Sequence, residues 1–165
     1  MTFRLPIKRS FVTRTAVAVL GALALTAAVS LAAAQQPGNG DRNGRPHLSD
    51  LMLGAQTGHV KLWFAGKNRN WDLAAYETRQ IRNRLQEAAS LYQSLPVNDV
   101  TTMAKPLDAV SAAIAAKDGR KFARAYDELT AGCNSCHQSV KLGFINVQAP
   151  GSHPFSDQDF APPRK

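Results

Sequence analysis

Apolar residues recur every three or four positions between Ser49 and Val140, which is the period of amphipathic α-helices. The pattern falls into four segments, 49–65, 71–95, 102–117 and 120–140. Ser49 is expected to cap the first helix, and Pro96 to end the second. Each segment carries one apolar stripe, and the stripes are best buried against one another. The sequence therefore predicts an all-α chain folded as an antiparallel four-helix bundle, with no strand before Phe144.

The segments on either side of this pattern have a different composition. Residues 35–46 are polar and rich in Gly and Pro, which is typical of a flexible tether. Residues 143–165 hold four of the nine prolines and have no helical period. We expect one bundle domain over residues 47–142, followed by an extended C-terminal tail over residues 143–165.

The first 34 residues are typical of a secretory signal rather than of a folded domain. A basic region comes first, an apolar run rich in Ala, Leu and Val follows over residues 16–34, and the run closes on three alanines, which suits cleavage after Ala34. The alternative is an uncleaved membrane anchor, since about 19 apolar residues can just span a bilayer. Cleavage predicts a periplasmic protein, and only an uncleaved segment would attach the chain to a membrane.

The signal segment also accounts for half of the excess positive charge. Its removal takes away four basic residues and no acidic one, so that the net charge falls from +8 to +4. This balance gives no reason to expect a nucleic-acid partner, which would require a concentrated basic face.

The two cysteines of the chain lie in one motif, CNSCH, formed by Cys133, Asn134, Ser135, Cys136 and His137. Residues three apart lie on one face of a helix, so both thiols can add to the vinyl groups along one edge of a porphyrin. The adjacent imidazole of His137 then points at the iron. The motif therefore predicts one covalent haem c, with Cys133 and Cys136 as its thioether attachments and His137 as the proximal iron ligand.

Other roles for two cysteines at this spacing fit less well. A redox disulfide of this type usually opens a helix in an α/β domain, whereas this motif closes a helix in an all-α pattern. A zinc site would need more ligands, and His47, His59 and His153 are scattered along the chain. A structural disulfide over so short a loop would brace almost nothing.

The motif lies near the end of the fourth predicted helix, and in this respect the chain resembles the cytochrome c-prime family and its low-spin relatives. That family often has a basic residue, more often Arg, four positions after the proximal histidine, where this chain has Lys141. The resemblance covers residues 49–141 in layout only, and the tail from Gly143 has no counterpart in it. Proteins of this layout often form homodimers through their first two helices, and the resemblance leaves that assembly open.

In the resembled family the first helix supplies the distal face of the iron. The low-spin members place a Met near its start, and cytochrome c-prime places an apolar side chain there and leaves the iron five-coordinate. Met52 matches that position and is the candidate distal ligand. His59, two turns further along the same face, is the weaker alternative, since antiparallel helices would place it away from the level of CNSCH. Either residue is also ordinary for a helix core, and a distal site that is open or holds water is the third alternative.

These features predict a protein that is not an enzyme: a monohaem cytochrome that carries single electrons between exported redox proteins. The alternative is a five-coordinate haem protein that binds nitric oxide or carbon monoxide as a sensor or scavenger. A peroxidase is a weaker option because it would need a distal acid/base group, and only His59 could serve.

Overall fold

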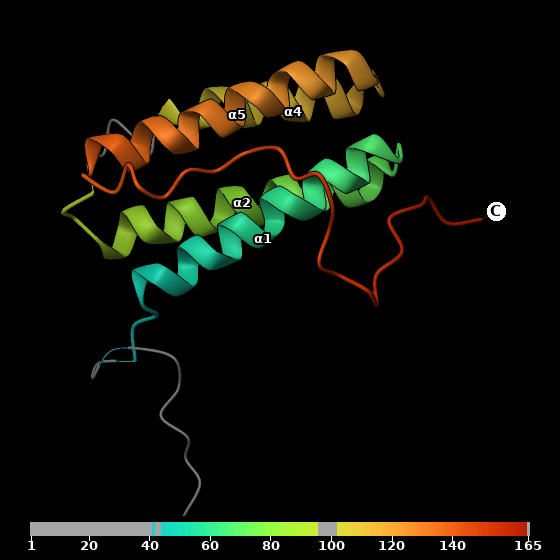
Figure 1. The fold of residues 1–165 in the computed structure, drawn as a ribbon. Coiled ribbons are helices and arrows are strands. Elements are labelled where there is room, and N and C mark those ends of the chain that lie inside the picture. Colours follow the sequence, from blue (N-terminus) through green and yellow to red (C-terminus); the bar gives the residue numbers. More distant parts are fainter. Residues whose placement is uncertain (1–40, 42–43, 96–101, 165) are drawn as a thin grey trace, which may run out of the picture. The chain divides into compact units, whose positions relative to one another are not determined.

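The computed structural model describes residue 41, residues 44–95 and residues 102–164. The predicted signal segment and most of the predicted tether lie outside these ranges. Within them the chain forms four helices and no strand: α1 (Leu48–Lys67), α2 (Trp71–Leu91), α4 (Ala104–Ala115) and α5 (Gly119–Ser139) (Figure 1). The all-helical prediction is therefore confirmed. None of these described helices is long and apolar enough to cross a membrane.

The helix ends follow local capping, and one predicted cap is wrong. The backbone of His47 is extended and Leu48 is already helical, so His47 is the N-cap of α1 and Ser49 lies within the first turn. The N-caps of α2 and α5, which were not predicted from the sequence, both use short polar side chains. Asn70 accepts a hydrogen bond from the Leu73 N–H at 3.2 Å before α2. Asp118 accepts bonds from two N–H groups, each at 3.0 Å, before α5.

Helix α2 ends at Leu91, four residues before the predicted end. The backbone of Tyr92 leaves the helical region with φ −122° and ψ 84°. Its hydroxyl donates a hydrogen bond of 2.7 Å to the Pro46 carbonyl, just before α1. This bond holds the end of α2 against the chain that enters α1.

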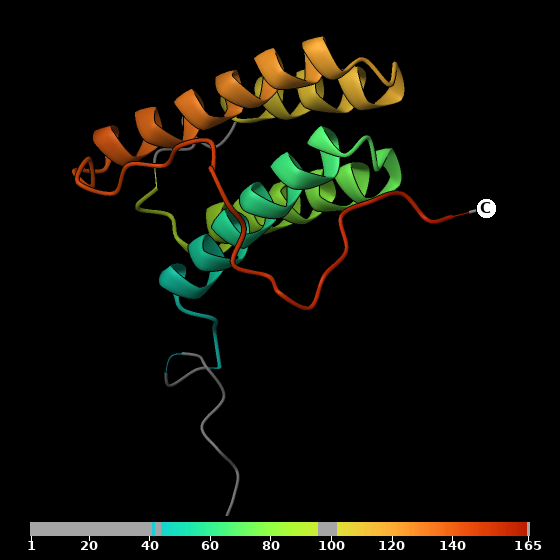
Figure 2. The same ribbon diagram turned by 45° about the vertical axis from the view of Figure 1, so that its right-hand side comes forward.

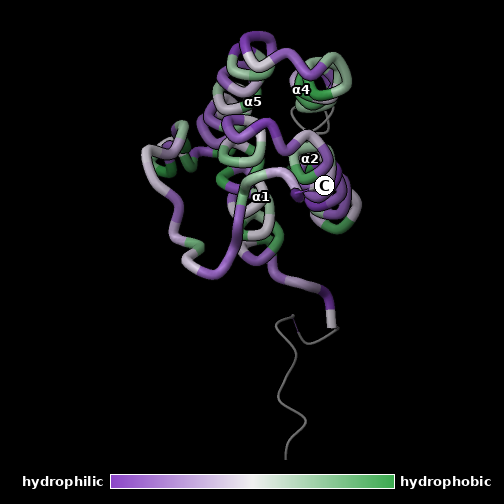
Figure 3. The backbone as a smooth tube through the Cα atoms, turned by 90° about the vertical axis from the view of Figure 1, so that its right-hand side faces the viewer, coloured by the Kyte–Doolittle hydropathy of each residue, from purple (hydrophilic) through white to green (hydrophobic). Residues whose placement is uncertain are grey.

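The helices pack as two neighbouring pairs, α1 with α2 and α4 with α5 (Figures 1 and 2). Residues 68–70 connect the first pair, and residues 116–118 connect the second. The pairs meet through contacts of α2 with α4 and of α1 with α5. Figure 3 shows hydrophobic and hydrophilic stretches along the backbone of each helix, as expected where apolar residues recur every three or four positions.

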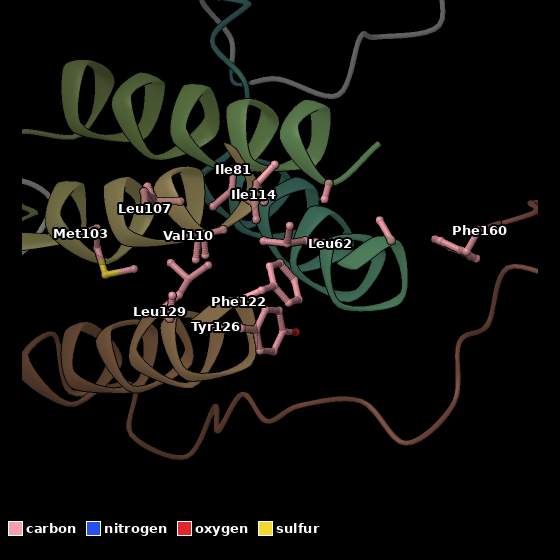
Figure 4. Packing of buried hydrophobic residues seen from close by; sticks show 14 residues of the cluster. Leu62, Ile81, Met103, Leu107, Val110, Ile114, Phe122, Tyr126, Leu129 and Phe160 are labelled. Atoms are coloured by element: carbon pink, nitrogen blue, oxygen red, sulfur yellow. The ribbon is translucent and has the colours of Figure 1, made fainter. Parts of the chain in front are cut away.

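The core lies where the four apolar stripes meet. Leu62 of α1, Ile81 of α2, Val110 of α4 and Leu129 of α5 are all buried there. Figure 4 shows these side chains converging on the rings of two aromatic residues of α5. Burial of an aliphatic side chain of this size contributes about 1.5–3 kcal/mol. The stripes expected from the sequence for α2, α4 and α5 therefore contribute to the core.

The expected face of α1, which runs through Met52, Gln56, His59 and Trp63, is wrong in part. Leu51 and Leu62 are buried instead, and Gln56 is exposed.

The residues after α5 contain no helix or strand between 140 and 164. They contact α1 and the start of α2 at several points. Phe160 is only 4% exposed and lies 5.8 Å from the Phe64 ring. The Lys61 ammonium lies 4.7 Å from the centre of the Phe155 ring, and the Asn70 amide donates to the Ala161 carbonyl at 2.9 Å.

We predict that Gly66→Ala destabilises the protein by about 1–3 kcal/mol. A Cβ atom at Gly66 would overlap the buried Phe122 ring, whereas nothing lies within 4 Å of a Cβ at Gly119. Gly119→Ala is therefore the matched control, and its stability should be unchanged or slightly raised. Urea unfolding followed by circular dichroism measures both. Equal midpoints for the two variants would contradict the close approach of α1 to Phe122.

Candidate functional site

The CNSCH motif occupies the last two turns of α5. Cys133 and Cys136 are both half-buried, and both are thiols in this structure. Since they are three residues apart in a continuous helix, their side chains leave α5 on the same face. His137 follows directly and is also half-buried. The helix thus places two sulfur atoms and one imidazole together, as the sequence spacing predicts.

The environment of Cys133 keeps its sulfur protonated. Burial raises the pKa of this thiol to about 11, and a negative charge on the neighbouring Cys136 would raise it further. Cysteines that catalyse disulfide exchange have lowered pKa values, because the thiolate is the nucleophile. The surroundings of Cys133 therefore oppose a role as the attacking group of a redox dithiol.

The imidazole of His137 is oriented by the segment that follows α5. Its Nδ1 lies 2.8 Å from the Ile145 carbonyl oxygen. A carbonyl can only accept, so Nδ1 carries the proton and donates it to this bond. In the neutral imidazole this leaves Nε2 as the nitrogen with a lone pair for a metal. A backbone carbonyl on the second ring nitrogen is the usual support of a metal-binding histidine.

Asn134, between the two cysteines, also holds the segment after α5. Its Nδ2 donates to the Val147 carbonyl at 2.8 Å, and its Oδ1 accepts from the Val147 N–H at 2.8 Å. The Asn134 side chain thus binds both the backbone N–H and the backbone C=O of Val147. Figures 1 and 2 show this segment running back along α5.

His59 of α1 faces α5 in the core, and only 3% of the residue is exposed. The Tyr126 hydroxyl lies 2.8 Å from its Nδ1, and the Thr130 hydroxyl oxygen lies 2.8 Å from its Nε2. The Thr130 hydroxyl donates its own proton to the Tyr126 carbonyl at 2.8 Å. Thr130 must therefore accept from the Nε2–H of His59. The single proton of the Tyr126 hydroxyl is shared between Nδ1 of His59 and the His59 carbonyl oxygen, which lies 3.0 Å away.

These bonds form a closed set in which neutral His59 uses both ring nitrogens. Burial lowers the pKa of His59 to about 4 and raises the pKa of Tyr126. Each group is therefore uncharged at neutral pH. The Tyr126 ring also lies 4.4 Å from the His59 ring and 4.8 Å from the Trp63 ring.

The other predicted residues lie at the start of α1 and just beyond α5. Met52 is half-buried in α1, between buried Leu51 and exposed Leu53. Lys141 lies outside α5, is exposed and has a left-handed backbone with φ 63°. In the part of the chain that the structure describes, His, Cys, Asp and Glu form no group of three or more that could hold a metal ion.

Sequence reasoning missed the residues that surround the predicted site. Asn134 stands at a position of the motif where the spacing specifies no residue type. Ile145 acts through its carbonyl, which every residue possesses, so no side-chain signal identifies it. Tyr126 lies on the predicted apolar face of α5 and Thr130 lies one turn later, but the sequence does not indicate that either binds a residue about 70 positions earlier.

The chain matches no protein-family model, no curated protein and no solved structure.

We predict that His59 makes stability depend on pH between about 6.5 and 4. The unfolded chain takes up a proton near the ordinary pKa of 6.5, while the folded chain resists protonation down to about pH 4. The contribution is therefore complete above pH 6.5 and is lost as the pH falls toward 4. Between pH 7 and pH 5 the loss is about 2 kcal/mol.

The measurement is urea unfolding at both pH values, for the natural chain and for His59→Gln. The difference between the two proteins isolates His59 from other titrating groups. The natural chain should lose more stability on acidification than the variant. The same loss in both would show that His59 does not titrate in this way.

Proposed function

We propose that this chain is a monohaem c-type cytochrome that carries single electrons, with haem held by Cys133 and Cys136 and iron ligated by His137. The observation that carries the proposal is the state of His137. It follows the two thiols on one helix face, and its Nδ1 is bonded to the Ile145 carbonyl, so that Nε2 is left for iron. No zinc or disulfide interpretation requires this arrangement.

The residues present fit a covalent haem. Cys133 and Cys136 would form the thioether bonds, and His137 would provide the proximal ligand through Nε2. When bound, the haem supplies one-electron chemistry at its iron. The chain holds the group permanently, orients the imidazole through the Ile145 carbonyl and surrounds the site with half-buried helix residues, which influence the potential.

We further propose that the helices form an antiparallel bundle and that residues 143–165 are its extended tail. The cross-contacts between α1 and α5 support this. The Trp63 ring of α1 stacks 6.4 Å from the Phe122 ring of α5. His59 lies one turn before Trp63 in α1, and it contacts Tyr126 and Thr130, which lie one and two turns after Phe122 in α5. The contacts thus move backward in α1 as they move forward in α5. Continued for two more turns, the same progression brings Met52 level with the segment from Cys133 to His137.

Met52 is accordingly our choice for the distal ligand, and His59 is a structural residue. Met52 is half-buried, and the progression of contacts along α1 and α5 supports this choice, whereas both ring nitrogens of His59 are engaged with Tyr126 and Thr130. If Met52 and His137 both held the iron, a diatomic gas would find no free position and the reduction potential would be higher, which would suit an electron carrier. The motif requires maturation outside the cytoplasmic membrane, so we place the protein in the periplasm with exported redox partners.

Covalent attachment is tested by producing the chain with c-type maturation and extracting it with acidified acetone, which removes haem that is not covalently bound. The natural chain should retain one haem, visible as a mass increase in the denatured protein. The double variant Cys133→Ala/Cys136→Ala should retain none, and Ser135→Ala should behave like the natural chain. A natural chain without covalent haem, or a double variant that keeps it, would refute the assignment.

Substitution of Met52 by Leu tests the distal side, because Leu keeps the volume and removes the sulfur. The absorption spectra of the reduced proteins are recorded before and after carbon monoxide is added. The natural chain should show low-spin bands that carbon monoxide leaves unchanged, and Met52→Leu should show a high-spin band that shifts. If the natural chain itself binds carbon monoxide, Met52 is not a ligand and a gas-binding function is favoured.

A further inference from the structure

We propose that Asn134 is a positioning residue for the proximal ligand: it holds the segment after α5 so that the Ile145 carbonyl sets the orientation and basicity of His137. This inference rests on the proposed haem attachment. It assigns to the part of the chain after the bundle a role in tuning the iron. It also gives a function to a position inside CNSCH that the attachment chemistry leaves unspecified.

The Ile145 carbonyl is fixed from both sides. On one side, the Leu142 N–H donates to the His137 carbonyl at 2.7 Å, and the Ile145 N–H donates to the Leu142 carbonyl at 2.8 Å. These bonds close a turn that begins at His137 itself. On the other side, two residues further along, Asn134 binds both the N–H and the C=O of Val147 at 2.8 Å.

The two-point bond to Val147 restrains more than one distance. A single hydrogen bond leaves the peptide free to rotate, whereas a donor and an acceptor on one planar amide fix both its position and its direction. Asn134 and Val147 are half-buried, so water competes less for these bonds than it would on an open surface. Without the Asn134 amide, the carbonyl would lose this second restraint and keep the turn after His137.

The position of this carbonyl bears on the electronics of the iron. A hydrogen bond donated by Nδ1–H increases electron donation from Nε2 and so favours the ferric state, which carries the greater positive charge. Loss or lengthening of the bond makes the imidazole a weaker donor. The reduction potential should then rise, while the thioether bonds and the iron ligands stay the same.

The test compares the matured holoprotein of the natural chain with Asn134→Ala and with Ser135→Ala. Ser135 lies beside Asn134 in the same motif and is exposed, which makes it the matched control. We expect Asn134→Ala to shift the ferric-to-ferrous equilibrium about tenfold toward the ferrous form, a rise of about 59 mV for one electron. Ser135→Ala should leave the potential unchanged.

If Asn134→Ala lowered the melting temperature and left the reduction potential unchanged, Asn134 would contribute to stability alone, and the inference would be overturned. Loss of covalent haem in the natural chain would overturn the proposed function as well, so the two failures are distinct.

A second measurement on the natural holoprotein covers the case in which Asn134→Ala does not mature. The Nδ1 proton of His137 should give a hyperfine-shifted proton resonance that persists in D₂O, because the bond to Ile145 and the held segment protect it. Immediate exchange of this proton would overturn the inference.

Discussion

The hydrogen bonds of His59 with Tyr126 and Thr130 fix α1 against α5, and the proposed site depends on that contact. All three groups satisfy one another within the core, with no charge at neutral pH. An unsatisfied buried polar group costs about 1–3 kcal/mol, so sliding α1 by one turn would be strongly disfavoured. The same contact occupies both ring nitrogens of His59, and its position along the two helices supports our proposal of Met52 as the distal ligand.

The second constraint comes from the chain after the last helix. Residues 143–164 bind back to α5 through Asn134 and His137, and to α1 through Phe155 and Phe160. The carbonyls of α5 point along the helix axis and so do not reach Nδ1 of the His137 side chain. The segment after α5 provides that acceptor through the Ile145 carbonyl, which is part of the site that we propose.

Much of this organisation is readable from the sequence, for identifiable reasons. Apolar stripes at helical spacing predict the four helices, because burial of those stripes drives packing. The spacing of Cys133, Cys136 and His137 suffices to place them on one turn of α5. The end of α2 was not predictable, since it depends on a bond from Tyr92 to Pro46, 46 residues away. Ser49 was a wrong cap because the local backbone, rather than the residue type, sets where α1 begins.

The site shows the same division between local and distant causes. The spacing of Cys133, Cys136 and His137 in CNSCH is a local feature, so the sequence alone places these residues on one helix. The partners of His59 and the carbonyl on His137 involve distant side chains or main-chain atoms, which residue types alone do not specify. The sequence assigns no role to Asn134, because its two bonds to Val147 become visible only in the folded chain.

The central claim is that one iron is bound to His137 in a haem on α5, facing the start of α1. The most direct measurement is a crystal structure of the matured protein with an anomalous difference map recorded at the iron absorption edge. The account predicts one peak per chain, bonded to Nε2 of His137, with Met52 on the opposite side. A map without an iron peak, or with iron on other residues, would contradict it.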